Sequence, residues 1–301
     1  MNSDKVFLVG QVSLVANEQF TLFADNIEDT SNGRNQLFRQ VFSNAIDNKK
    51  TVCKSKLVDN VFLYKTLLSD NIIYFQLAKQ KKKEINTLVD DEIKPVEFDD
   101  FPPIDLFVNL KLQQILIEVK ENVFPLNDAI AVVGRIISTY VRKHNYSVYI
   151  NTIDDTKEFW DFIESKNVDE ITEIQFEMVA PNFYGVMGQA KDLVSEAKNN
   201  LNASEVVVSL KNKKGKLKAT AQHLDSYVKY SSVSGKWKVK FRKDGYVKTL
   251  KSDDTTLKRT VSEQIIDTIK NIANGDNNES INAYNNCVSE IEKLFVDRDL
   301  I

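Results

Sequence analysis

Along roughly the first 120 residues, apolar side chains recur either at every second position, as in strands, or at every third to fourth position, as in helices. The β-branched run from Lys5 to Val15 predicts a first strand. Between Arg34 and Asp47, the apolar side chains fall on one helical face, which predicts a helix. Paired apolar runs, each interrupted by a short polar turn, then predict two hairpins: Val61 to Leu68 with Ile72 to Ala78, and Leu106 to Leu110 with Ile115 to Lys120.

The second half of the chain alternates predicted strands and helices. A long helix follows Pro125, with Asn127 as a candidate N-cap. The next elements are strand Tyr146 to Ile150, helix Thr156 to Ser165, strand Ile171 to Val179, helix Val186 to Asn199, strand Glu205 to Leu210 and helix Leu217 to Tyr230. This alternation indicates βαβ units and a sheet covered by helices. Two C-terminal helices are predicted, Thr256 to Ala273 and Ser280 to Phe295.

These elements predict an α+β fold with three segments. Residues 1–100 form an N-terminal β-rich α+β region, residues 101–255 a central region of alternating β/α units with a basic hairpin, and residues 256–301 a helical pair. Across the junction of the first two segments, the polar stretch from Lys79 to Pro103 is interpreted as a long loop. The overlapping acidic stretch from Asp90 to Asp105 is explained by solubility, or alternatively by shielding of a basic surface or by binding of a partner.

One stretch alternates basic and apolar residues strictly, from Lys236 through Trp237 to Arg242. Successive strand side chains point to opposite faces, so the cations share one face and the apolar residues share the other. Asp244-Gly245 predicts a hairpin turn, and the return strand from Tyr246 to Lys251 is expected to bring further cations beside the first row.

Charge makes this hairpin a candidate binding surface. Residues 211–259 hold fifteen of the chain's 40 Lys+Arg residues and four of its 43 acids, about +11 within a chain of net charge −3. A local excess of cations is typical of a site for a polyanion. A solvated face without a ligand and an acidic protein partner are the alternatives. The candidate nucleic-acid-binding residues are Lys213, Lys214, Lys216, Lys236, Lys238, Lys240, Arg242, Lys243, Lys248 and Lys251.

Several landmarks between residues 100 and 255 carry a resemblance. They are the strand Ile115 to Lys120, the helix after Pro125, the sequence Ala180-Pro181-Asn182, the segment Asn202 to Val208 and the Gly235-Lys236 hairpin. In these the chain is similar to a bacterial family of unknown function found among phage-defence genes, and more remotely to the phage-exclusion protein RexA. The resemblance implies a defence or exclusion role, DNA as the nucleic acid, and no established enzyme chemistry. The N-terminal hundred residues lie outside it.

A second candidate site consists of Asp105 followed by Glu118 and Lys120. This spacing is similar to the PD-(D/E)xK nucleases, in which an Asp and a Glu hold a divalent metal and a Lys acts on the attacking water. Hard oxygen ligands suit Mg²⁺, and a nearby cation stabilises developing charge. A structural cross-strand charge pair is the alternative explanation, and we favour it.

Little else in the composition suggests chemistry. Cys53 and Cys287 lack a CxxC partner and the two histidines stand alone, so we expect no metal and no cofactor. The apolar runs are too short for a membrane span, and residues 1–5 lack the pattern of a secretory signal, so we expect a cytoplasmic protein. A partner protein from a defence system and a homo-oligomer stay open.

Overall fold

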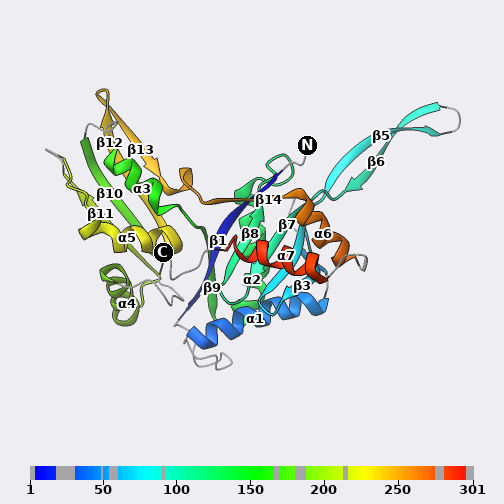
Figure 1. The fold of residues 1–301 in the computed structure, drawn as a ribbon, viewed down its shortest axis with the longest axis horizontal. Helices are drawn as coiled ribbons and strands as arrows, with labels where there is room; N and C mark the ends of the chain where they lie inside the picture. Colours follow the sequence, from blue (N-terminus) through cyan, green and yellow to red (C-terminus); the bar gives the residue numbers. More distant parts are fainter. Residues whose placement is uncertain are drawn as a thin grey trace.

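A computed structural model describes residues 4–17, 31–48, 50–53, 60–89, 92–165, 170–179, 188–212, 216–274 and 281–295. Among these, strands form a large sheet, a smaller sheet and a free ribbon, and helices cover the two sheets (Figure 1). The predicted α+β fold class is confirmed. Of the landmarks and candidates named above, Ala180 to Asn182, Lys213 and Lys214 lie outside the described residues.

The large sheet is organised around the first strand, β1 (Asp4–Ala16). In spatial order the path runs β14 (Lys258–Ser262), β1, β8 (Gln114–Glu118), β7 (Pro103–Asn109), β4 (Ile72–Lys79), β3 (Asn60–Ser69) and β2 (Lys50–Cys53). The strand β9 (Tyr146–Thr152) also pairs with β1, beyond the end of β14. This sheet draws strands from each of the three predicted segments, residues 1–100, 101–255 and 256–301.

Helices cover both faces of the large sheet because β1 is apolar on both sides. Val12 and Leu14 face a core that includes α1 (Ser31–Asn48) and α2 (Leu126–Val141). Phe7 and Val9 face the opposite core, which includes α6 (Glu263–Ala273) and α7 (Ile281–Glu292). Period-two alternation places these neighbours on opposite faces.

The small sheet has the order β11 (Glu205–Lys211), β10 (Glu170–Val179), β12 (Gly235–Lys243) and β13 (Tyr246–Lys251). One face packs against α3 (Thr156–Glu164), α4 (Gln189–Leu201) and α5 (Ala221–Ser234) in a third core that includes Trp237 and Phe176. Helix α5 also contacts β9 and β1 of the large sheet. The two sheets are therefore joined through α5, whose C-terminal part is buried.

Three sequence predictions need correction. All strand pairs of both sheets are antiparallel, so the alternating order does not form parallel βαβ units. The predicted loop from Lys79 to Pro103 is a two-stranded ribbon, β5 (Lys81–Val89) with β6 (Glu92–Asp100). It was missed because both of its faces carry polar residues, so the strand period is weak. The predicted helix Thr256 to Ala273 begins with an edge strand, β14, and α6 starts only after Ser262, whose Oγ accepts the N–H of Ile265.

Candidate nucleic-acid interface

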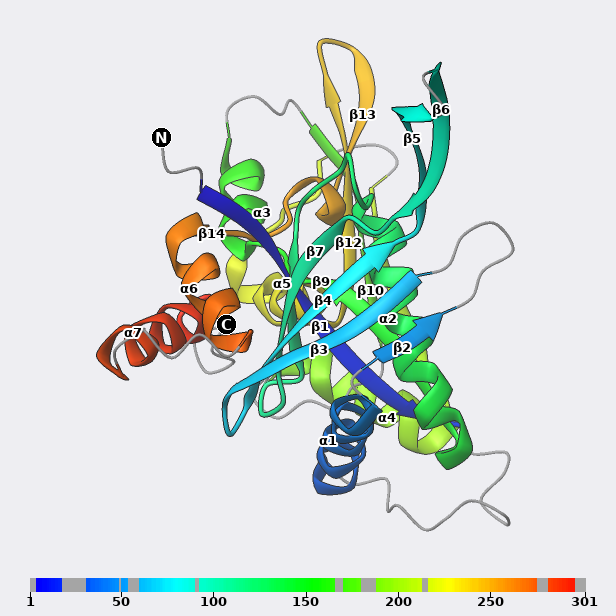
Figure 2. The same ribbon diagram turned by 90° about the vertical axis from the view of Figure 1, so that its right-hand side faces the viewer.

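The basic hairpin consists of β12 and β13 and has the predicted alternation. Trp237, Val239 and Phe241 are buried against the helices of the small sheet, whereas Lys236 and Arg242 are exposed on its other face. Asp244 and Gly245 both have positive φ, 52° and 78°, as the tight turns of two-residue hairpins require. The hairpin prediction is confirmed, and the turn extends beyond the body of the molecule (Figures 1 and 2).

An acidic row on β10 lies directly beside the basic row of β12. Glu173 is the cross-strand neighbour of Lys240, and Glu170 of Arg242. The Lys240 Nζ lies 2.8 Å from a Glu173 carboxylate oxygen, and the Arg242 guanidinium lies 2.9 Å from Glu170. The hydrogen bond from Lys240 lowers the pKa of Glu173. Opposite charges paired across strands stabilise a sheet, so these cations have a structural role.

Two further contacts neutralise cations of this face. Lys211 of β11 lies 3.2 Å from the same Glu173, and Lys236 Nζ lies 2.9 Å from Asp253 in the turn after β13. Sequence reasoning missed these acids. The polar–apolar alternation along β10 could have revealed Glu173, because it matches the alternation of cations and apolar residues on β12. Its polar positions are Glu173, Gln175 and Glu177, and its apolar positions are Ile174, Phe176 and Met178.

Within the described part of the chain, four hairpin lysines form no ion pair: Lys238, Lys243, Lys248 and Lys251. Lys238 and Lys251 are cross-strand neighbours, and on its other side Lys238 faces the neutral Gln175. Like charges directly opposite each other destabilise a sheet unless something compensates them. We call Lys238, Lys243, Lys248 and Lys251 the free-lysine group.

The free-lysine group occupies both faces of the hairpin. Lys251 lies on the open face with Lys238, as predicted, but Lys248 is opposite Phe241 and therefore lies on the helix-covered side. Lys243 pairs with Tyr246, whose side chain is 73% exposed. Lys216 lies at the end of the small sheet that carries the hairpin turn. The next residue, Leu217, donates its N–H to the carbonyl of Ile171, and Ile171 pairs with Phe241 close to that turn. Cations and an exposed aromatic ring thus surround the turn.

The second candidate site does bring its two carboxylates together. The Asp105 N–H donates to Glu118 Oε2 at 2.8 Å across β7 and β8. Lys120, however, lies beyond the end of β8, is exposed, and forms an isolated bridge with Phe124. Asp105 is 1% exposed and Glu118 is 6% exposed, so a nucleic-acid phosphate does not reach them.

Cations of the chain itself already compensate this acidic pair. Lys5 Nζ lies 2.8 Å from Asp105 and 3.1 Å from Glu118, and Lys270 Nζ lies 3.1 Å from Asp105. Tyr74 also donates to Asp105. Burial alone would raise the pKa of Asp105, but the hydrogen bonds it receives, above all from Lys5, outweigh burial and lower it to about 2. The arrangement is a buried charge network in which Lys5 bridges the two carboxylates.

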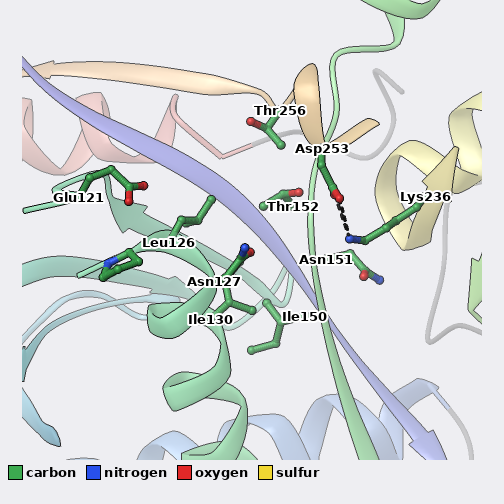
Figure 3. A pocket seen from close by; sticks show the side chains of 11 residues that line it. Glu121, Leu126, Asn127, Ile130, Ile150, Asn151, Thr152, Lys236, Asp253 and Thr256 are labelled. Atoms are coloured by element: carbon green, nitrogen blue, oxygen red, sulfur yellow. Dashed lines mark hydrogen bonds and ion pairs between the residues drawn. The ribbon is translucent and has the colours of Figure 1, made fainter. Parts of the chain in front are cut away.

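A cavity of about 450 Å³ lies where the two sheets meet, between the start of α2, the end of β9 and the base of the hairpin (Figure 3). Its lining combines apolar side chains such as Ile130 and Ile150 with Asn151, Lys236 and Asp253. Just beyond β9, Asp154 is buried and its backbone N–H donates to Ser232 of α5. Burial, reinforced by the charge of Asp253, raises the pKa of Asp154 to about 8. Asp154 is therefore largely protonated at neutral pH.

In sequence comparisons, no family model and no curated protein matches this chain. Among the described residues, no cluster of three or more His, Cys, Asp or Glu side chains is placed to hold a metal ion. None of the helices that the structure describes has the length and apolar character of a membrane span.

Proposed function

We propose that this chain binds nucleic acid, duplex DNA in the first instance, through the β12–β13 hairpin. The observation that carries the proposal is the cross-strand pair Lys238 and Lys251, which places two cations side by side. Neither ammonium group forms an ion pair with an acid among the described residues, although the Asp254 carboxylate accepts the backbone N–H of Lys251. A phosphate between two such ammonium groups removes their mutual repulsion. The ion-paired cations Lys236, Lys240 and Arg242 then hold the sheet, while the free-lysine group meets the ligand.

The shape of the hairpin suits a groove of duplex DNA. The major groove admits a two-stranded β-ribbon, and both of its walls carry phosphates. Only the tip of the hairpin can enter a groove, because β12 also pairs with β10 as far as Arg242. Lys243 and Lys248 near the tip would then meet a wall of the groove, and Lys238 and Lys251 on the open face of the sheet would meet phosphates outside it. The exposed Tyr246 at the turn supplies a ring that could stack or pack within the groove.

The chemistry of the group favours contact with the backbone over reading of bases. All four residues are lysines, which act as flexible point charges, whereas bidentate reading of guanine is chiefly a property of arginine. Phosphate contacts position a protein and carry no direct sequence information. Binding with little sequence choice is the expected behaviour, and specificity would come from a partner or from the state of the DNA.

The proposed role is non-enzymatic phage defence or exclusion in the cytoplasm. It rests on the resemblance of residues 100–255 described above. No observation favours the nuclease alternative, since Asp105 and Glu118 are buried and ion-paired and Lys120 lies apart from them.

The decisive experiment measures affinity for a fluorescent duplex at several salt concentrations. The test variant carries Lys243→Glu, Lys248→Glu and Lys251→Glu. Its control carries Lys111→Glu, Lys120→Glu and Lys143→Glu, three exposed lysines elsewhere with the same total change in charge. If about four phosphates are neutralised, the wild-type slope of log K against log[salt] is about −3.6.

The hairpin variant should lose binding and the control should keep most of it. Equal losses would mean that only net charge matters, and a wild type that does not bind would refute the proposal. The same duplex incubated with Mg²⁺ tests the alternative, because cleavage that is lost in Glu118→Gln would favour a nuclease.

A further inference from the structure

The β5–β6 ribbon stands away from the rest of the molecule (Figures 1 and 2). Its strands pair with each other from Lys81 with Asp100 to Val89 with Glu92, and no other described element packs extensively against them. At its base, Lys81 Nζ donates to the carbonyl of Asn122. An isolated two-stranded hairpin is marginally stable in water, so an arm of this kind gains from being covered.

The arm carries apolar side chains that its own fold does not bury. Leu88 is 68% exposed and its cross-strand partner Ile93 is 75% exposed. The pair Ile85 and Val96 and the nearby Phe98 are also exposed. Exposed apolar groups concentrated on a projecting element, with charged residues around them, are typical of a site of protein interaction.

Charge indicates what covers the arm. Residues 81–100 contain four lysines and seven acids, a net charge of −3, which disfavours nucleic acid and favours a basic partner. The β12–β13 hairpin, residues 235–251, contains seven cations and one acid, a net charge of +6. Around its turn Tyr246 and Val247 are exposed as well. The chain therefore holds two projecting hairpins of opposite charge, each with an uncovered apolar group.

We propose that the β5–β6 arm of one copy docks on the β12–β13 hairpin of a second copy. Figure 1 places the two hairpins at opposite ends of the body, both extending from the same side, so an arm does not reach its own hairpin. A half-turn about the viewing direction of that figure, centred between the two projecting tips and above the body, exchanges the two tips and inverts the second copy. A second copy related by such an axis would place each arm on the other's hairpin, and the two reciprocal contacts would double the buried area.

In this arrangement Leu88 and Ile93 meet Tyr246 and Val247, and the acids of the arm meet Lys243 and Lys248. The contact uses the surface proposed for nucleic acid, so self-association and nucleic-acid binding exclude each other. Self-association is measured without nucleic acid, and the two proposals can therefore fail separately.

The test is sedimentation equilibrium of the full chain over a concentration series, with circular dichroism of every variant to verify folding. Leu88→Ser with Ile93→Ser removes the apolar contact. The matched control is Leu201→Ser, an exposed leucine at the end of α4. The arm variant should weaken self-association by at least about tenfold and the control should not.

Charge reversal tests the partner surface independently. Glu92→Lys with Glu97→Lys on the arm, and Lys243→Glu with Lys248→Glu on the hairpin, should each weaken association. A chain that carries all four changes should recover it in part, because the four reversed side chains again face opposite charges, although the arm and the hairpin are then both net positive, +1 and +2. A wild type that stays monomeric, or association that none of these changes affects, would overturn the proposal. Loss in both single reversals without recovery in the combined variant would also overturn it, because the two surfaces would then not contact each other.

Discussion

Asp105 and Glu118 share the ammonium group of Lys5, which lies 2.8 Å from the first carboxylate and 3.1 Å from the second. The three side chains come from three neighbouring strands of the large sheet, β7, β8 and β1. Burial opposes the charged form of Lys5, but its hydrogen bond and its attraction to both carboxylates outweigh burial and raise its pKa. The network therefore stays charged at neutral pH.

Lys5→Met should destabilise the fold by about 3–5 kcal/mol, because it leaves two buried carboxylates with only part of their compensation. Urea unfolding monitored by circular dichroism measures this change, and Lys111→Met, at an exposed lysine, is the control. Because the pKa of Asp105 is lowered from 3.8 to about 2, its contribution is present above pH 4 and is lost as the pH falls toward 2. A Lys5→Met variant as stable as wild type would contradict the network.

Asp154→Asn should change how stability depends on pH. The pKa of Asp154 is raised from 3.8 to about 8, so between these values the folded state holds a proton that the unfolded state has released. Its stabilising effect is complete below pH 4 and is lost as the pH rises through 8. The total loss is on the order of a few kcal/mol, since one pKa unit corresponds to about 1.4 kcal/mol.

Asparagine mimics the protonated carboxyl group, so the variant should lose this pH dependence and exceed wild type in stability at pH 9. Unfolding in urea across a pH series measures both effects. A wild-type profile that stays flat between pH 4 and pH 8 would show that Asp154 is not the buried acid described.

Glu173→Gln should strengthen nucleic-acid binding. Glu173 accepts contacts from both Lys211 and Lys240, so its neutralisation frees two cations on the open face. With two more phosphates neutralised, the slope of log K against log[salt] should become more negative by about 1.8. Glu158→Gln, an exposed acid on α3, is a control for net charge, and equal gains in both variants would contradict the specific effect.

Gly235→Ala should destabilise the chain where α5 meets β12. A Cβ atom at this position would collide with the backbone carbonyl oxygen of Glu177 on the neighbouring strand, so main chain must move. We expect a loss on the order of 3 kcal/mol, the upper range for overpacking. Gly245→Ala has open space but a φ of +78°, so it should cost only about 1 kcal/mol. Thermal unfolding of both variants gives the comparison, and equal losses would contradict the close packing.

Local patterns predicted the hairpin of the candidate site well, because alternation and the Asp244-Gly245 turn are short-range signals. The same patterns did not show which cations are free. The acids that pair with Lys240 and Arg242 lie on β10, roughly seventy residues earlier in the sequence. The sequence of either strand alone does not determine the register in which two distant strands pair. That register decides which lysines form ion pairs within the sheet and which can contact a ligand.

The same reasoning applies to the acidic pair. Sequence spacing brought Asp105 and Glu118 together correctly, since a hairpin joins their strands. It also suggested Lys120 as the associated cation, whereas the structure uses Lys5 and Lys270 from opposite ends of the chain. The β5–β6 arm was taken for a loop because Ile85, Leu88, Ile93 and Val96 fall on different faces and give no continuous apolar stripe.

The pairing of β1 with β14 also determines when this protein can complete its fold. Lys5 is opposite Val261, so β1 is synthesised roughly 250 residues before the strand that pairs with this part of it. Until then the edge of β1 that pairs with β14 is unpaired along the first half of the strand. Contacts between residues so far apart in the sequence form slowly. The nascent chain therefore carries an unpaired edge on β1 until β14 has been made, and its yield should depend on chaperones that bind apolar strands.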